Sequence, residues 1–168
     1  MIHIRYADAN DAELLGAIHS ASWKRAYKGI LSDEVLGGIT AERRTSYFRK
    51  ALREGWEEDA ILFHHGQAIG MICIGKSRDT DLNEKWGEIW GIYLLPEHWK
   101  KGFGSMLISW GISELDQRGF THVSLWVLEE NFSARDFYVK TGFIHDGAVK
   151  EVHIGKAVTE MRYTLKIS

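Results

Sequence analysis

One stretch of the chain restricts its fold more than any other. Residues 87–95 form a hydrophobic segment typical of a strand, and the basic turn Lys100-Lys101-Gly102-Phe103-Gly104 follows it. The next residues have apolar side chains at helical spacing, namely Leu107, Ile108, Ile112 and Leu115. Backbone N–H groups, the helix macrodipole and two ammonium groups thus converge on one point. The sequence predicts an anion site there, of the kind that holds a phosphate group.

Two common phosphate-binding motifs do not fit this turn. A dinucleotide fingerprint requires a third glycine where Leu107 stands, and a tighter turn straight after an early strand. The P-loop of nucleoside triphosphatases requires Lys-Ser or Lys-Thr after its second glycine, and Gly104 is followed by Ser105-Met106. A plain structural turn is the remaining alternative, because Gly-x-Gly is common in sequences.

The bulk composition narrows the class of protein. With 168 residues, 45% of them hydrophobic, the chain is large enough for one domain, which we expect to span residues 1–168. A net charge of -2 gives no support to nucleic-acid binding through a general basic face. The N-terminal Met1–Tyr6 does not resemble a signal peptide, and no apolar run is long enough to span a bilayer. We therefore expect a cytoplasmic protein without membrane or nucleic-acid partners.

No metal site is expected from the sequence. Cys73 is the only cysteine and lies in an apolar run, which favours the role of a small buried side chain over that of a nucleophile. None of the eight histidines has HExxH or HxH spacing, and His64 and His65 would point to opposite faces of a strand.

The order of predicted elements indicates an α/β (α+β) fold. A first strand at Ile2–Tyr6, capped helices up to Arg53, and a hairpin of strands 60–65 and 67–75 precede the opening segment. A helix over 102–117, a strand over 123–128, a helix starting after Asn131 and two final strands follow. We expect a mixed, mostly antiparallel sheet of about seven strands flanked by helices.

Two motifs together resemble the GNAT (GCN5-related) N-acetyltransferase superfamily. The first, Trp99-Lys100-Lys101-Gly102-Phe103-Gly104, is similar to the acetyl-CoA signature Gln/Arg-x-x-Gly-x-Gly/Ala, except that Trp99 replaces Gln or Arg. The second, Leu125 to Phe143, resembles the pattern L-x-V-x-x-x-N-x-x-A-x-x-F-Y-x-x-x-G-F. The resemblance implies a GNAT fold and an enzyme that transfers the acetyl group of acetyl-CoA directly to a primary amine.

The resemblance also assigns roles to residues of this chain. Amides of the fourth strand at Ile92, Tyr93 and Leu94 would bind the pantetheine arm, and Asn131 would hydrogen-bond it. The loop would hold the pyrophosphate through Lys100, Lys101, Gly102, Phe103, Gly104 and Ser105. Tyr138 would be the general acid, because a phenol of pKa about 10 can protonate a departing thiolate. The alternative is that Tyr138 is only a core aromatic residue.

The attacking amine must lose a proton, and Glu88 is the predicted base. It stands where some histone-acetylating relatives keep a glutamate, and it alternates with Trp90 and Ile92 on one face of the strand. Aromatic neighbours would favour a raised pKa. A solvated position for Glu88, with a chain of waters as base, is the alternative.

The acceptor pocket is expected beside the early helices. Trp23 and Tyr27 are four residues apart and would form one aromatic ledge, which suits a cationic or flat acceptor but equally a core or a dimer contact. The acceptor would be a small-molecule amine or a peptide amine, and a homodimer is common in the superfamily. A non-catalytic acyl-CoA-binding module of the same fold is the rival function.

Overall fold

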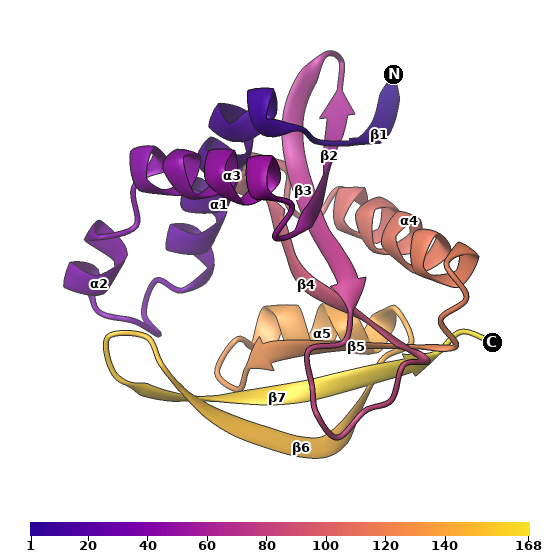
Figure 1. The fold of residues 1–168 in the computed structure, drawn as a ribbon. Coiled ribbons are helices and arrows are strands. Elements are labelled where there is room, and N and C mark those ends of the chain that lie inside the picture. Colours follow the sequence, from indigo (N-terminus) through magenta and orange to yellow (C-terminus); the bar gives the residue numbers. More distant parts are fainter.

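A seven-stranded sheet in the order β1-β2-β3-β4-β5-β7-β6 runs through the computed structural model, which describes residues 1–168 (Figure 1). All neighbouring strands are antiparallel except β4 and β5, which are parallel. The strands are β1 (Ile2–Tyr6), β2 (Glu58–His64), β3 (Gln67–Lys76), β4 (Trp86–Leu94), β5 (His122–Leu128), β6 (Ile144–His153) and β7 (Ala157–Lys166). The prediction of a mixed, mostly antiparallel sheet of about seven strands is confirmed.

Helices begin where short polar side chains can accept a hydrogen bond from the first turn. Ser32, Thr40 and Asn131 accept from backbone N–H groups three residues ahead. The helices are α1 (Ala12–Ala26), α2 (Asp33–Gly37), α3 (Ala41–Glu54), α4 (Phe103–Gln117) and α5 (Phe132–Lys140), with 3₁₀ turns η1 (Ala9–Asp11) and η2 (Pro96–His98). None of them has the length and apolar character needed to cross a bilayer.

The helices cover the two faces of the sheet unequally. α1 and α3 pack through Leu15, Ile18 and Phe48 on the face that carries Ile61 and Met71. On the opposite face, α4 and α5 contribute apolar side chains to the larger core, which includes Leu107, Ile108, Leu115 and Tyr138. Figure 1 shows α1 and α3 on one side of β2 and β3 and α4 on the other. The C-terminal strands β5, β7 and β6 carry a helix on one face only, so their other face is available to line a site.

A bulge in β4 changes one predicted arrangement. Cys73 pairs with Gly91 and Ile74 with Ile89, so Trp90 is an extra residue with no partner on β3. Glu88 and Trp90 lie on the face of α1 and α3, but the bulge moves Ile92 to the α4 face, where it packs on the larger core. The prediction that Glu88, Trp90 and Ile92 share one face is therefore wrong for Ile92.

The β2–β3 hairpin also differs from the sequence prediction. His65 has φ 52° and Gly66 φ 79°, so both belong to a two-residue turn, and neither extends a strand. The turn brings the rings of His64 and His65 to 4.1 Å between centroids, so they do not point to opposite faces.

Candidate active site

The site is built around a gap in the sheet between β4 and β5. The two strands pair only from Trp86 to Glu88 on β4 and from His122 to Ser124 on β5. Beyond Glu88 they diverge, so the second half of β4 has a neighbour on the β3 side alone. Since alternate residues of a strand direct their backbone groups to opposite sides, this half of β4 presents hydrogen-bonding groups to the gap.

The backbone of the predicted arm-binding segment is partly occupied at its end. The Leu94 N–H donates to the buried hydroxyl of Ser22 on α1 at 3.3 Å. The Leu94 carbonyl accepts from the indole N–H of Trp99 at 2.7 Å. Trp99, the residue that departs from the family signature, thus fastens the glycine turn to the end of β4. Because the Leu94 groups point away from β3 and backbone direction alternates, Ile92 directs its backbone groups to the gap and Tyr93 directs its own to β3.

The turn after β4 offers a run of unpaired donors. Lys100 and Gly102 both have positive φ, at 61° and 88°, and α4 begins immediately after Gly102 without a side-chain cap. The backbone N–H groups of residues 100–105 have no hydrogen-bond partner in the protein; the first paired one is that of Met106, which donates to Gly102. Such a concave run of amides at a helix N-terminus binds anions. The two lysines add positive charge, so the loop fits a pyrophosphate.

The two glycines of the turn are required for different reasons. Gly102 adopts the left-handed conformation that other L-residues rarely adopt, but a Cβ there would contact nothing within 4 Å. Gly104 has ordinary backbone angles, but its Cβ would lie 3.3 Å from the ring of Phe137 on α5. α4 and α5 therefore approach each other closely at the loop, and a side chain at position 104 would press them apart.

Asn131 and Tyr138 reach the same region from α5. The Asn131 side-chain oxygen caps the helix by accepting from the Ala134 N–H at 3.3 Å, which leaves its amide nitrogen without a protein partner. Tyr138 is 8% exposed and packs on Phe143 and Tyr163. Its hydroxyl makes no hydrogen bond within the protein and is not fully buried, so it is accessible to solvent. Burial raises the pKa of Tyr138 above the ordinary value, so the group stays protonated at neutral pH.

Three tyrosine hydroxyls in this part of the molecule are without a protein partner. Like that of Tyr138, the hydroxyls of Tyr27 and Tyr93 have no protein partner and are not buried. Burial raises the pKa of Tyr93 to about 12. Burial also raises the pKa of Tyr27, and electrostatic interaction with Tyr93, Tyr138 and Glu160 raises it further. The predicted ledge is present as well, because the rings of Trp23 and Tyr27 meet edge to face at 4.4 Å between centroids.

Glu88 is placed differently from a free catalytic carboxylate. It is 1% exposed. Its oxygens accept from the backbone N–H of Arg78 at 2.9 Å and from the guanidinium of Arg78 at 2.7 Å. Arg78 also lies over the ring of Trp90, at 4.3 Å from the centroid. Glu88 thus holds the β3–β4 loop against the sheet, and its oxygens are already occupied.

Glu160 on β7 is a carboxylate near the site that the sequence gave no reason to select. It pairs with Leu128 at the open end of β5, and its side chain is 22% exposed. Burial raises the pKa of Glu160, while Lys150, at 3.8 Å, acts in the opposite direction. A half-buried carboxyl with a raised pKa is suited to accept a proton near neutral pH. No local motif marks it, because its position depends on how β7 pairs with β5.

Buried Arg162, two residues along β7, fixes the wall opposite the helices. It is 6% exposed, and its guanidinium binds Asp79 and Asp81 of the β3–β4 loop and Asp146 of β6, at 3.3, 2.8 and 2.7 Å. Trp126 donates to Asp79 from its indole N–H. These contacts hold the loop over the face of β5 and β7 that no helix covers.

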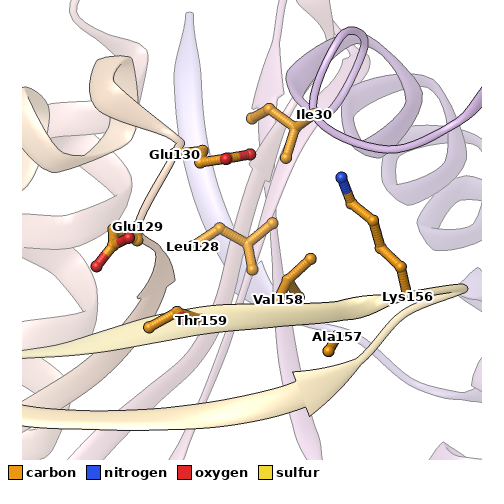
Figure 2. Close-up of a pocket in the computed structure, with 8 residues that line it drawn as sticks. All are labelled: Ile30, Leu128, Glu129, Glu130, Lys156, Ala157, Val158 and Thr159. Atoms are coloured by element: carbon orange, nitrogen blue, oxygen red, sulfur yellow. The ribbon is translucent and has the colours of Figure 1, made fainter.

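A cavity of about 140 Å³ lies near the end of the β6–β7 hairpin. Figure 2 shows Ile30, from the segment after α1, facing Leu128 and Val158 across it, with Glu130 and Lys156 at its edges. Glu129, Ala157 and Thr159 complete its lining. A second cavity of about 390 Å³ shares Ile30 and Lys156 with it. The two cavities are lined by apolar side chains, by the carboxylates of Glu129 and Glu130 and by the ammonium group of Lys156.

Comparison with known proteins decides the family. A family model described as "Acetyltransferase (GNAT) family" matches residues 21–143, which include the β4–β5 gap, the glycine turn and α5. The chain belongs to the GNAT acetyltransferase family. Family membership confirms the predicted enzyme class, an N-acetyltransferase that uses acetyl-CoA. The roles of single residues in this GNAT enzyme stay predictions.

Relatives of the GNAT enzyme cover nearly the whole chain. A probable N-acetyltransferase of Mycobacterium tuberculosis is 30% identical over 149 residues, which are 87% of this chain and 82% of the relative. A spermidine N(1)-acetyltransferase of Thermoplasma acidophilum is 26% identical over 147 residues, 84% of this chain and 88% of the relative. The crystal structure of the PaiA N-acetyltransferase of Thermoplasma acidophilum, in complex with coenzyme A, has a TM-score of 0.76 at 23% identity and covers 99% of both chains. This similarity confirms the predicted GNAT fold.

Proposed function

We propose that this enzyme acetylates a primary amine of a small polycationic molecule, with acetyl-CoA as the donor and Tyr138 as the general acid. The observation that carries the proposal is the loop of six unpaired amides together with the unpaired hydroxyl of Tyr138 on α5, the helix that packs against the loop at Gly104. The loop would bind the phosphates of the donor, and Tyr138 would lie beside its reacting end.

The chain's own groups fit coenzyme A along the gap. The amides of residues 100–105, with Lys100 and Lys101, would neutralise the pyrophosphate, and the Ser105 hydroxyl can add a hydrogen bond. Backbone groups of Ile92 would bind the pantetheine arm as an added strand, whereas those of the predicted Tyr93 are directed to β3 and those of Leu94 are engaged by Ser22 and Trp99. The free amide nitrogen of Asn131 would bind the arm from α5.

Acetyl-CoA supplies an acetyl thioester whose carbonyl carbon accepts the amine and whose thiolate departs. Tyr138 would donate its phenolic proton to the departing sulfur, and its raised pKa guarantees that the proton is present. The Tyr93 and Tyr27 hydroxyls would orient the amine and hold water beside it. The Trp23–Tyr27 ledge would line the acceptor side of the space.

Glu160 is a better candidate than Glu88 for the base. Both oxygens of Glu88 are engaged by Arg78 and shielded from solvent, so the carboxylate cannot reach an amine without breaking that pair. Glu160 is partly accessible, lies within electrostatic reach of Tyr27 and Tyr93, and has a raised pKa. It would accept the amine proton directly or through a water held by Tyr27 or Tyr93.

The acceptor side favours a cation. Glu160 lies within electrostatic reach of Tyr27 and Tyr93, and the cavity that includes its neighbour Thr159 is lined by two carboxylates, Glu129 and Glu130, against one cation, Lys156. The relative from Thermoplasma acidophilum is named for spermidine, which carries several ammonium groups. Carboxylates on one side and aromatic rings on the other would stabilise such an acceptor by charge and by cation–π contact.

Product analysis by mass spectrometry tests this proposal. Wild-type enzyme, Glu160→Gln and the exposed control Glu151→Gln would be incubated with acetyl-CoA and with spermidine, a neutral amino sugar or a peptide with a free N-terminus. We expect acetylated polyamine from wild type and Glu151→Gln. In wild type, kcat/KM should rise with pH through the pKa of Glu160. Glu160→Gln should be about a hundredfold slower, and its kcat/KM should not show this rise. Preferred acetylation of the peptide or the neutral amine would refute the acceptor assignment.

Cytoplasmic location and a homodimer remain proposals. The second rests on the frequency of dimers in the superfamily. Fractionation of cells followed by light scattering of the purified protein tests both; a monomer at micromolar concentration would contradict the dimer.

A further inference from the structure

Three side chains that no sequence motif connects meet beneath α3. Asp59 on β2 and Cys73 on β3 are directly paired across the two strands, and Glu57 immediately precedes β2. One oxygen of each carboxylate and the Cys73 sulfur all lie within 4.8 Å of one another. The face of the sheet that carries them is covered by α3, because Tyr47 of that helix donates to Glu57 at 2.5 Å.

Asp59 has no partner in this cluster. It is 1% exposed, and neither of its carboxylate oxygens accepts a hydrogen bond. Glu57 by contrast accepts from Tyr47 and, at 3.4 Å, from the thiol of Cys73. A buried carboxylate with no donor is strongly unfavourable unless a cation or a proton compensates it. Asp59 therefore requires either a bound cation or a proton on its carboxyl group.

The nearest cationic side chain does not fill this role. The Arg44 guanidinium lies over the rings of Tyr47 and Phe48, at 4.5 and 4.9 Å from their centroids, and donates no hydrogen bond to Glu57 or Asp59. Its Nε is itself buried without a partner. The charge of Arg44 is close to the cluster, but the Asp59 oxygens still lack a bonded partner.

We propose that Glu57, Asp59 and Cys73 bind a divalent transition-metal ion, with Zn²⁺ the best match. A thiolate beside two carboxylates suits a borderline-soft ion and disfavours Mg²⁺ and Ca²⁺, which take oxygen ligands alone. Three protein ligands leave one tetrahedral position for water or the Tyr47 hydroxyl. Binding releases the thiol proton of Cys73 to solvent and forms the metal–sulfur bond. The ion would join α3 to β2 and β3, away from the glycine turn.

This inference departs from the sequence prediction, which found no metal site and gave Cys73 an apolar role. It is independent of the acetyl transfer proposed above, because none of the three residues belongs to the donor site or the tyrosine cluster. Positions 57, 59 and 73 do not form a recognisable ligand motif in the sequence, and only the register between β2 and β3 brings these three side chains together.

Titration of the metal-free protein with Co²⁺ tests the site. Because Cys73 is the only cysteine of the chain, a thiolate-to-cobalt absorption band in the near ultraviolet reports this site alone. We expect the band to saturate at one equivalent, to disappear on addition of Zn²⁺, and to be absent in Cys73→Ser. Asp59→Asn should weaken Co²⁺ binding at least about tenfold. Zn²⁺ should raise the melting temperature of wild type and of the control variant Glu58→Gln, and a chelator should reverse this increase.

Glu58→Gln is the matched control. Glu58 lies between the two carboxylates in sequence, and it pairs instead with Arg118 at 2.6 Å. The Glu58→Gln variant should bind Co²⁺ with the affinity of wild type. The alternative is a proton shared between Glu57 and Asp59: it predicts no band and no effect of Zn²⁺ or chelator on melting, and it would overturn the proposal. Undiminished Co²⁺ affinity in folded Asp59→Asn would overturn it as well.

Discussion

Substituting Gly102 with alanine separates the contribution of the turn's shape from that of its charge. Gly102 has φ 88° and ψ -4°, and a Cβ there meets no atom within 4 Å, so the new methyl group clashes with nothing. Only the left-handed backbone is penalised, by about 1–2 kcal/mol. The turn is exposed and its amides are unpaired, so it should relax and lose the aligned donors. Coenzyme A binding would then have to supply the free energy that realigns these amides, and its affinity would fall about five- to thirtyfold.

Gly119→Ala provides the matched control for this experiment. Gly119 follows the other end of α4, has φ 92°, is exposed, and also has no atom within 4 Å of an added Cβ. The same strain therefore arises there without an anion site. Isothermal titration calorimetry with coenzyme A should show weakened binding for Gly102→Ala and wild-type binding for Gly119→Ala, with thermal melts confirming that both are folded. Equal losses of affinity, or none in Gly102→Ala, would refute the role of the amide cradle.

Three further substitutions test the surroundings of the site. Trp99→Phe removes the indole N–H that donates to the Leu94 carbonyl, a hydrogen bond that contributes about 1 kcal/mol. The KM for acetyl-CoA should rise up to about fivefold in steady-state assays. An unchanged KM would contradict the role of Trp99 in holding the glycine turn to the end of β4. Arg162→Met removes the guanidinium from Asp79 and Asp146 and should lower the unfolding free energy by about 3 kcal/mol in urea titrations. A loss below about 0.5 kcal/mol would show that the buried pairs contribute little. Arg5 lowers the pKa of Asp11, so this pair stabilises the fold above the ordinary carboxyl pKa of about 3.9, and the stabilisation is lost as pH falls through the lower pKa of the folded state. In thermal melts from about pH 6 to pH 2, the melting temperature of Asp11→Asn should therefore depend less on pH than that of wild type. The same pH dependence in both proteins would contradict the linkage.

Local sequence signals predicted the parts of the fold that depend on local chemistry. Asn131 caps α5 because its side chain accepts from an N–H three residues ahead, a rule that operates within one turn. Gly119 ends α4 with positive φ, as a terminal glycine does. The glycine turn was recognisable for the same reason, since strand, basic turn and helix are contiguous in the chain.

The features that sequence could not predict depend on strand register. The extra residue Trp90 appears only when β4 is paired with β3, and it reverses the face of Ile92. Glu160 reaches the site through the pairing of β7 with β5, and the cluster of Glu57, Asp59 and Cys73 through the pairing of β2 with β3. Glu88 seemed free for catalysis because its partner, Arg78, lies in a loop whose course no local motif specifies.

The central claim is that amine-dependent cleavage of acetyl-CoA relies on Tyr138, and release of free thiol measures it most directly. Wild type, Tyr138→Phe and Tyr163→Phe would be compared across an amine panel; Tyr163 lies in the same core, but its hydroxyl accepts from Arg135. Wild type and Tyr163→Phe should release thiol only when an amine is present, and Tyr138→Phe should bind coenzyme A normally with kcat reduced at least about a hundredfold. Full activity of Tyr138→Phe, or no release with any amine despite tight coenzyme A binding, would contradict the account.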